Sequence, residues 1–313
     1  MKLNLQTAAF VFPGQGSQVV GMGQALSAQY PNAKQTFDEA DAILGFSLSK
    51  LMTEGAADEL NDTVNTQPAL FAHSMASYRV FAHLYSDLAP VALAGHSLGE
   101  LSALAASGAL SFEEGLRLVR KRGELMKRAG ELAPGGMAAI LGVDIPTLDK
   151  VCAEACAENE IVQVANDNCP GQVVISGAKA AVERAMAGAK AAGAKRAVPL
   201  PISIAAHSPL MASIQDEWNS AVDSTNFVAS KIPVIGNVHA TILKSADEAR
   251  ADVKAQMQSR VKWTDSIKFM TDMGIHAFVE AGTGSVLSGL IKRIASAATT
   301  YPLGVPQDFA ALE

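Results

Sequence analysis

The sequence predicts an α/β protein: a large domain built on a mostly parallel sheet, with a smaller domain inserted into it. Short apolar segments alternate with helical segments in the first and last parts of the chain, which is typical of a parallel sheet. Between them the order becomes strand, helix, strand, strand, helix, strand, the ferredoxin-like arrangement. We therefore expect a large domain of residues 1–130 and 205–313 and a small domain of residues 131–204.

The elements of the large domain follow from apolar runs and helical periodicity. The first strand, 8–12, ends at Pro13-Gly14, and the second, 91–94, is a continuous apolar run of the kind that is buried on both faces of a sheet. Further strands are expected at 233–237 and 277–280. Helices are expected at 31–44, 67–84, 100–106, 116–128, 208–223, 246–259, 264–273 and 285–296.

The small domain is expected to contain four strands and two helices. The two middle strands are joined by a predicted turn at 166–171, which contains Pro170-Gly171. The expected strands are 137–143, 161–165, 172–176 and 196–199, and the expected helices are 145–159 and 178–192.

Composition and charge narrow the possible settings and partners. The chain has 313 residues, 49% of them hydrophobic, but no apolar run of transmembrane length and no signal-peptide pattern at its start. The net charge is −6, without a basic tail, so nucleic acid is not an expected partner. Three cysteines, Cys152, Cys156 and Cys169, form no CxxC pair, and we interpret them as buried thiols rather than metal ligands. We expect a cytoplasmic protein with no metal and no membrane partner.

The most informative motif is Gly-His-Ser-Leu-Gly at 95–99, which places Ser97 between an apolar strand and a helix. Strand, sharp Gly-x-Ser-x-Gly turn and helix are the context of a nucleophile elbow, where the serine hydroxyl stands exposed above the sheet. The backbone amide of Leu98, at the start of the helix, is oriented to stabilise an oxyanion. We interpret Ser97 as a nucleophile.

A serine nucleophile needs a base, and His207 has the best position among the six histidines. It lies at a strand-to-helix junction downstream of Ser97, and the loops of an α/β fold converge at the carboxyl edge of the sheet. A capping or core role for His207 stays open. No Asp or Glu between Ser97 and His207 has a clear strand-end setting, so an amide or a backbone carbonyl is expected to orient the imidazole instead. His96, next to the nucleophile, is kept as a candidate substrate-binding residue.

Arg122 is the second unusual residue, because it lies at the centre of the apolar face of helix 116–128. A guanidinium on a buried face is costly unless an anion meets it. Two partners stay open: a core carboxylate such as Glu100, in a structural ion pair, or the carboxylate of a substrate, held by two hydrogen bonds.

Five segments together resemble the malonyl-CoA:acyl carrier protein transacylases of fatty-acid synthesis, over essentially the whole chain. They are FVFPGQGSQ at 10–18, TQPA at 66–69, GHSLGE at 95–100, PGQVVI at 170–175 and EAG at 280–282. The resemblance implies an α/β-hydrolase-like large domain with a ferredoxin-like small domain. It departs from the common family pattern at Ala206 and Cys169, where neither change removes a catalytic group.

The resemblance also implies a role for each site residue. Ser97 is the expected nucleophile and His207 its base, with Leu98 and Gln15 supplying the oxyanion hole and Arg122 pairing with the malonyl carboxylate. Gln256, seven residues before Trp263, matches a glutamine that helps to fix the active-site geometry, and Gln258 is its competitor.

The expected reaction is a double displacement that needs no cofactor. Ser97 takes the malonyl group from malonyl-CoA, and the phosphopantetheine thiol of acyl carrier protein then takes it from Ser97. An esterase or thioesterase shares the elbow but lets water attack, and a non-catalytic acyl-binding module would need neither nucleophile nor base. Malonyl-CoA and acyl carrier protein are the expected partners, and a monomer is expected.

Overall fold

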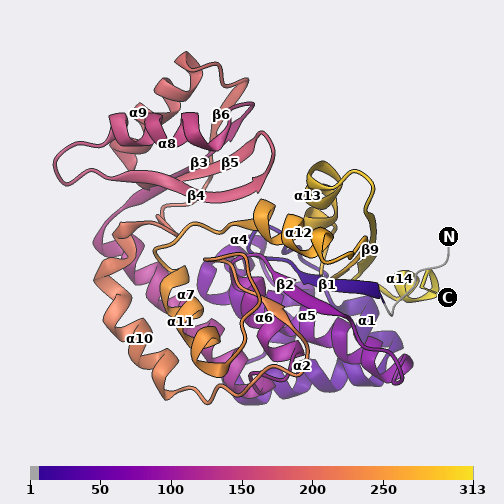
Figure 1. Ribbon diagram of the computed structural model, residues 1–313. Coiled ribbons are helices and arrows are strands. Elements are labelled where there is room, and N and C mark those ends of the chain that lie inside the picture. Colours follow the sequence, from indigo (N-terminus) through magenta and orange to yellow (C-terminus); the bar gives the residue numbers. More distant parts are fainter. Residues whose placement is uncertain (1–6, 313) are drawn as a thin grey trace.

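A five-stranded parallel sheet runs through the larger part of the molecule (Figure 1). The computed structural model describes residues 7–312. The strand order is β7-β2-β1-β8-β9, so the first strand of the chain is central and its neighbours come from distant parts of the sequence. The strands are β1 (Ala8–Phe12), β2 (Ala92–Gly95), β7 (Val234–Ile235), β8 (Ala277–Ala281) and β9 (Thr299–Leu303).

Helices cover both faces of this sheet (Figure 1). Alternate residues of β1 point to opposite sides: Phe10 and Phe12 belong to the larger apolar cluster, and Ala9 and Val11 to a second cluster on the other face. Because both faces are covered, the continuous apolar pattern of this strand is explained. The helices are α1 (Gln24–Gln29), α2 (Pro31–Leu44), α3 (Leu48–Glu54), α4 (Ala57–Asn61), α5 (Thr63–Leu84), α6 (Leu98–Ala106), α7 (Phe112–Leu132), the 3₁₀-helix η2 (Pro209–Ile214), α10 (Gln215–Ser224), α11 (Ala246–Gln256), α12 (Trp263–Asp272), α13 (Val286–Ile294) and α14 (Pro306–Ala310).

A second, four-stranded antiparallel sheet lies to one side and has the order β4-β5-β3-β6 (Figure 1). One face packs on its two helices through an apolar cluster of its own, while Met137, Ala165 and Val174 join the larger cluster of the main sheet. Its elements are β3 (Gly135–Leu141), α8 (Ile145–Ala155), β4 (Val162–Cys169), β5 (Gln172–Ala178), α9 (Lys179–Ala191) and β6 (Arg196–Pro199). The α/β class and the ferredoxin-like order predicted from the sequence are confirmed, while the domain boundaries at 131 and 204 stay a prediction.

Some local predictions were wrong. The turn expected at 166–171 is mostly strand: β4 continues to Cys169 through two register shifts and only Pro170-Gly171 turns, with Gly171 at φ 73°. The polar residues Asn166 to Asn168 therefore do not break the strand. The edge strand β9 was missed, and Cys156 is exposed rather than buried. Within residues 7–312, no helix has both the length and the apolar character needed to cross a membrane.

Candidate active site

Ser97 occupies a sharp turn between β2 and α6 that only glycine neighbours permit. Its backbone has φ 53° and ψ −107°, a conformation that non-glycine residues rarely adopt. A Cβ atom at Gly95 would lie 1.9 Å from the carbonyl carbon of Gly99, and one at Gly99 would lie 2.0 Å from the carbonyl oxygen of Phe12. The two glycines thus let the elbow pack directly against the end of β1. The predicted elbow is present.

The side chain of His207 meets Ser97 at this turn. The Oγ atom of Ser97 lies 2.7 Å from Nε2 of His207, and Nδ1 of His207 lies 2.8 Å from the backbone oxygen of Gln256. Because a carbonyl oxygen only accepts, Nδ1 carries the proton and Nε2 is free to accept the serine proton. A backbone carbonyl therefore takes the place of the acid of a Ser-His-Asp triad. This agrees with the sequence, where no suitable Asp or Glu was found and an amide or carbonyl was expected instead.

His207 is held in its neutral form. Burial, and then the neighbouring positive charge of Arg122, lower its pKa to about 3, although the hydrogen bond to the Gln256 carbonyl opposes the shift. The ring is only 3% exposed. At neutral pH the imidazole is thus unprotonated and able to act as a base.

Arg122 is buried, at 2% exposure, with its guanidinium against Ser97. Nη2 donates to Ser97 Oγ at 3.1 Å and to Oε1 of Gln256 at 2.8 Å, and Nη1 donates to Oε1 of Gln67 at 3.0 Å. These acceptors are all neutral, and no carboxylate within the described range forms an ion pair with Arg122. Burial lowers the pKa of Arg122 to about 10, so the group stays charged at neutral pH. The direct ion pair with Glu100 that the sequence left open is not formed.

Gln256, at the end of α11, is the glutamine that reaches the site. Its Nε2 donates to the backbone oxygen of Ser97 at 3.0 Å and to Oε2 of Glu100, while its Oε1 accepts from Arg122. The side chain of Gln258 instead donates to Gln215 at 2.8 Å, outside this group. The geometry thus separates the two candidates that sequence spacing could not.

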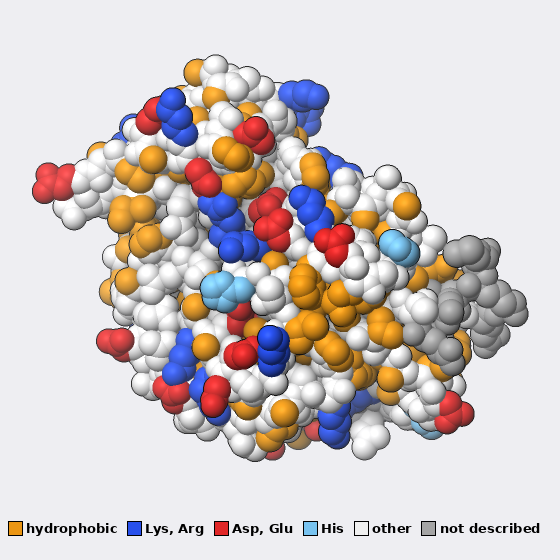
Figure 2. Space-filling model, viewed as in Figure 1, with side chains coloured by type: hydrophobic (Ala, Val, Ile, Leu, Met, Phe, Trp, Pro, Cys, Tyr) orange, Lys and Arg blue, Asp and Glu red, His pale blue; other side chains and the backbone are white. Residues whose placement is uncertain are grey.

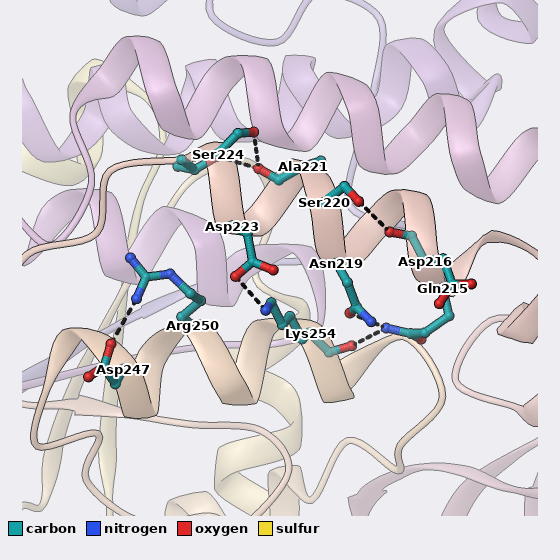
Figure 3. Close-up of polar contacts among 11 residues, drawn as sticks. Gln215, Asp216, Asn219, Ser220, Ala221, Asp223, Ser224, Asp247, Arg250 and Lys254 are labelled. Carbon is teal, nitrogen blue, oxygen red and sulfur yellow. Dashed lines mark hydrogen bonds and ion pairs between the residues drawn. The ribbon is translucent and has the colours of Figure 1, made fainter.

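Helix α11 is fixed by polar contacts to α10, which lies alongside it (Figure 3). The Nζ atom of Lys254 pairs with Asp223 at 2.5 Å, and the Gln215 side chain donates to the Lys254 backbone oxygen at 2.9 Å. The buried ring nitrogen of Trp218 donates to the Val253 oxygen at 3.0 Å. These contacts hold the last turn of α11, and with it Gln256, at the active site.

The two expected oxyanion-hole residues follow neighbouring strands: Gln15 comes shortly after β1 and Leu98 shortly after β2. The last residues of these strands, Phe12 and Gly95, lie opposite each other. Within residues 7–312 the backbone amides of Gln15 and Leu98 donate no hydrogen bond, so both can serve an incoming oxygen. The side chain of Gln15 accepts from Thr63 at 3.0 Å. Among the described residues, no group of three or more His, Cys, Asp or Glu side chains is arranged to hold a metal ion.

A serine–histidine pair beside a buried cation and free amides is able to form and break an acyl ester. Comparison with known proteins agrees. Residues 9–301 match the acyl transferase domain family. The chain belongs to this acyl transferase family.

Within the family, the chain is similar to malonyl CoA-acyl carrier protein transacylases. It is 46% identical to that of Escherichia coli strain K12 and 44% identical to that of Bacillus subtilis, over 97% and 96% of its length and 97% and 94% of theirs. The crystal structure of an acyl carrier protein S-malonyltransferase from Vibrio cholerae aligns with a TM-score of 0.94 at 42% identity, covering 98% of this chain and all of the other. A malonyl-transacylase in complex with its type II PKS acyl-carrier protein aligns with a TM-score of 0.93 at 41% identity, covering 97% and 98%.

Three residues of this acyl transferase site were missed from the sequence. Asn237 accepts from the Ser97 amide at 2.8 Å and donates to the Gly95 oxygen at 2.7 Å, so it holds both sides of the elbow. Gln67 orients Arg122, and Gln163 donates to the His207 oxygen at 2.8 Å from β4 of the small sheet. A polar residue that ends a predicted strand at the carboxyl edge was the available signal for Asn237.

His96, kept as a substrate-binding candidate, points away from Ser97 toward the small sheet. Its Nε2 lies 2.8 Å from Oδ1 of Asn168, and its ring meets that of Trp263 edge-on at 5.7 Å. The first contact connects the elbow to β4 of the small sheet, and the second connects it to α12. A direct role of His96 in substrate binding stays a prediction.

Proposed function

We propose that the protein transfers the malonyl group of malonyl-CoA to the phosphopantetheine thiol of acyl carrier protein, in support of fatty-acid synthesis. The observation that carries this proposal is the buried Arg122, which contacts Ser97 but has only neutral acceptors. A buried cation that no carboxylate contacts directly can bind an anionic substrate, and the malonyl group ends in a carboxylate.

In the first half-reaction, Ser97 Oγ attacks the thioester carbon of malonyl-CoA and its proton passes to Nε2 of His207. The negative oxygen that forms is stabilised by the amides of Gln15 and Leu98. As the carbon–sulfur bond breaks, His207 returns the proton to the sulfur of CoA. The product is a malonyl ester on Ser97.

In the second half-reaction, the carrier thiol replaces CoA and attacks the ester. His207 takes the thiol proton and returns it to Ser97 Oγ as the ester bond breaks. Once Oγ carries the acyl group, the Nη2 hydrogen bond from Arg122 passes to the malonyl carboxylate. That negative charge offsets the positive charge of Arg122, which is one of the causes that lower the pKa of His207, so substrate raises the pKa of its own base.

Intact-mass measurement after mixing with malonyl-CoA tests the proposal. We expect a persistent malonyl adduct that Ser97→Ala abolishes and that acyl carrier protein removes. His207→Ala is expected to slow the formation and the removal of the adduct together, by several powers of ten. Release of free malonate without an adduct would show a hydrolase instead, and no change in mass would show a non-catalytic acyl-binding module.

The carrier is expected to dock on basic side chains at the surface. Acidic and basic side chains gather between the small-sheet part and the larger part on the face shown in Figure 2. Five basic side chains are candidates for this docking surface. Two of them already form ion pairs, Lys121 with Glu217 and Arg117 with Glu113. The exposed Lys190, Lys195 and Arg196 form no ion pair with any residue that the structure describes. A monomer acting in the cytoplasm completes the proposal, and light scattering on the purified protein tests the first part.

A further inference from the structure

Two acidic side chains are buried directly behind the elbow, and the proposed reaction does not use them. Glu100, in the first turn of α6, is 0% exposed, and Asp252, on α11, is 4% exposed. The Glu100 carboxyl faces that of Asp252. Two ionised carboxylates in such contact, away from water, would repel each other strongly.

One oxygen of each carboxyl has a donor and the other has none. Oε2 of Glu100 accepts from Nε2 of Gln256, and Oδ2 of Asp252 accepts from the backbone amides of Asn237 and Val238 at 3.2 and 3.4 Å. Oε1 of Glu100 and Oδ1 of Asp252 are buried without a hydrogen-bond partner. Since buried polar atoms are normally paired, a single proton between these two oxygens would satisfy both.

The charges around the pair fit one shared proton. Arg122 on α7 is a buried cation that the Gln256 side chain links to Glu100, and His207 beside Arg122 is neutral. One proton leaves the carboxyl pair with a single negative charge, which balances the single positive charge of Arg122. Burial, and then the negative charge of Asp252, raise the pKa of Glu100 well above its usual range, which agrees with a proton held at neutral pH.

We propose that Glu100 and Asp252 share one proton and act as a single positioning unit for the active site. The unit works through two amide side chains. Because Oε2 of Glu100 accepts, Gln256 must present its NH₂ group there and its oxygen to Arg122. Asp252 fixes the backbone of Asn237, whose side chain holds the amide of Ser97 and the oxygen of Gly95.

The unit thus sets the position of Ser97 through Asn237, and the position of Arg122 through Gln256. This inference rests on the proposed acyl transfer at Ser97. It predicts that losing the pair disturbs both the rate of acylation and the preference for malonyl over acetyl. Displacement of a reacting group by about 1 Å lowers rates on the order of 100-fold.

The test compares Glu100→Leu with Glu100→Gln. Leucine offers no acceptor to Gln256 and no proton to Asp252, so we expect the rate of Ser97 acylation by malonyl-CoA to fall roughly 100-fold and the malonyl-to-acetyl ratio to fall with it. Glutamine keeps an acceptor for Gln256 and its NH₂ donates to Asp252, so this variant is expected to recover most of both quantities. Leu104→Ala, at a fully buried position of the same helix, is the control that lowers stability without changing the ratio.

Two outcomes would overturn the inference: a Glu100→Leu protein with unchanged acylation and ratio, or a Glu100→Gln protein as impaired as Glu100→Leu. Infrared spectroscopy of the unreacted protein at neutral pH gives a test that does not depend on acyl transfer and does not require the leucine variant to fold. We expect an absorption band of a protonated carboxyl that Glu100→Gln removes. Absence of that band would refute the shared proton, whereas a wild-type protein that shows the band but takes up no malonyl group would refute the proposed function instead.

Discussion

Replacing Arg122 by alanine removes the buried cation of the site. The effect of this change on two acyl donors shows whether the protein selects malonyl groups or transfers acyl groups in general. In the wild-type protein the guanidinium lies 3.1 Å from the serine that carries the acyl group, and it is 2% exposed. A carboxylate bound there would meet a cation that is itself shielded from water. An acetyl group has no carboxylate and gains nothing from the same contact.

The size of the effect follows from this burial. Truncating one partner of a buried, hydrogen-bonded charge pair costs on the order of 2–5 kcal/mol, which corresponds to a factor of roughly thirty to a few thousand in rate. Arg122→Ala is therefore expected to lose malonyl acylation by about that factor and to keep or improve acetyl acylation. Arg122→Lys is expected to recover only part of the loss, because a point charge cannot reproduce the planar fork.

The assay is the rate of acylation of Ser97 by malonyl-CoA and acetyl-CoA, followed by intact mass, together with the melting temperature. Truncation also leaves the oxygens of Gln67 and Gln256 without their donor, so some loss of stability is expected. Arg120→Ala is a matched control, since Arg120 lies on the same helix and pairs with Glu124. An unchanged malonyl-to-acetyl ratio in Arg122→Ala, with both rates reduced together, would refute the assigned role and leave Arg122 as a structural residue.

Three further predictions concern stability and docking. Burial lowers the pKa of His73 from 6.5 to about 4, so the folded state binds the proton less readily than the unfolded state, and stability is lost as pH falls from 6.5 to about 4. The expected loss is roughly 3 kcal/mol, and urea denaturation of His73→Phe is expected to show a smaller loss over this pH range than wild type. Gly99→Ala would force a Cβ atom to within 2.0 Å of the Phe12 oxygen, so we expect a fall of several kcal/mol in unfolding free energy, and near-wild-type denaturation would contradict the packing of the elbow. Lys195→Glu is expected to slow transfer to acyl carrier protein and reduce its salt dependence while malonyl-CoA acylation stays the same, whereas Lys121→Glu, at an already paired position, serves as the comparison.

Features that depend on neighbouring residues were predictable from the sequence. The elbow requires five consecutive residues between an apolar strand and a helix, and the structure has Ser97 there with positive φ. The ferredoxin-like order needs only the succession of strands and helices, which the local pattern shows. Because no suitable Asp or Glu was found in the sequence, we predicted that a carbonyl or amide would orient His207, and this is correct. For the elbow and the order of elements, the determining contacts lie close together in the sequence. The carbonyl that orients His207 belongs to Gln256, and the sequence predicted only the kind of group and not the residue.

Features that depend on contacts across the fold were decided only by the tertiary structure. Spacing could not separate Gln256 from Gln258, because what distinguishes them is a hydrogen bond to Ser97, 159 positions away. The partner of Arg122 was open for the same reason: Glu100 is near it but meets it through Gln256. Asp252 carries no local signal of its role, and the strand-end position of Asn237 does not show which groups its side chain binds. A side chain's partners and pKa are set by which groups close packing brings against it from distant parts of the chain, and that information exists only once those elements are in place.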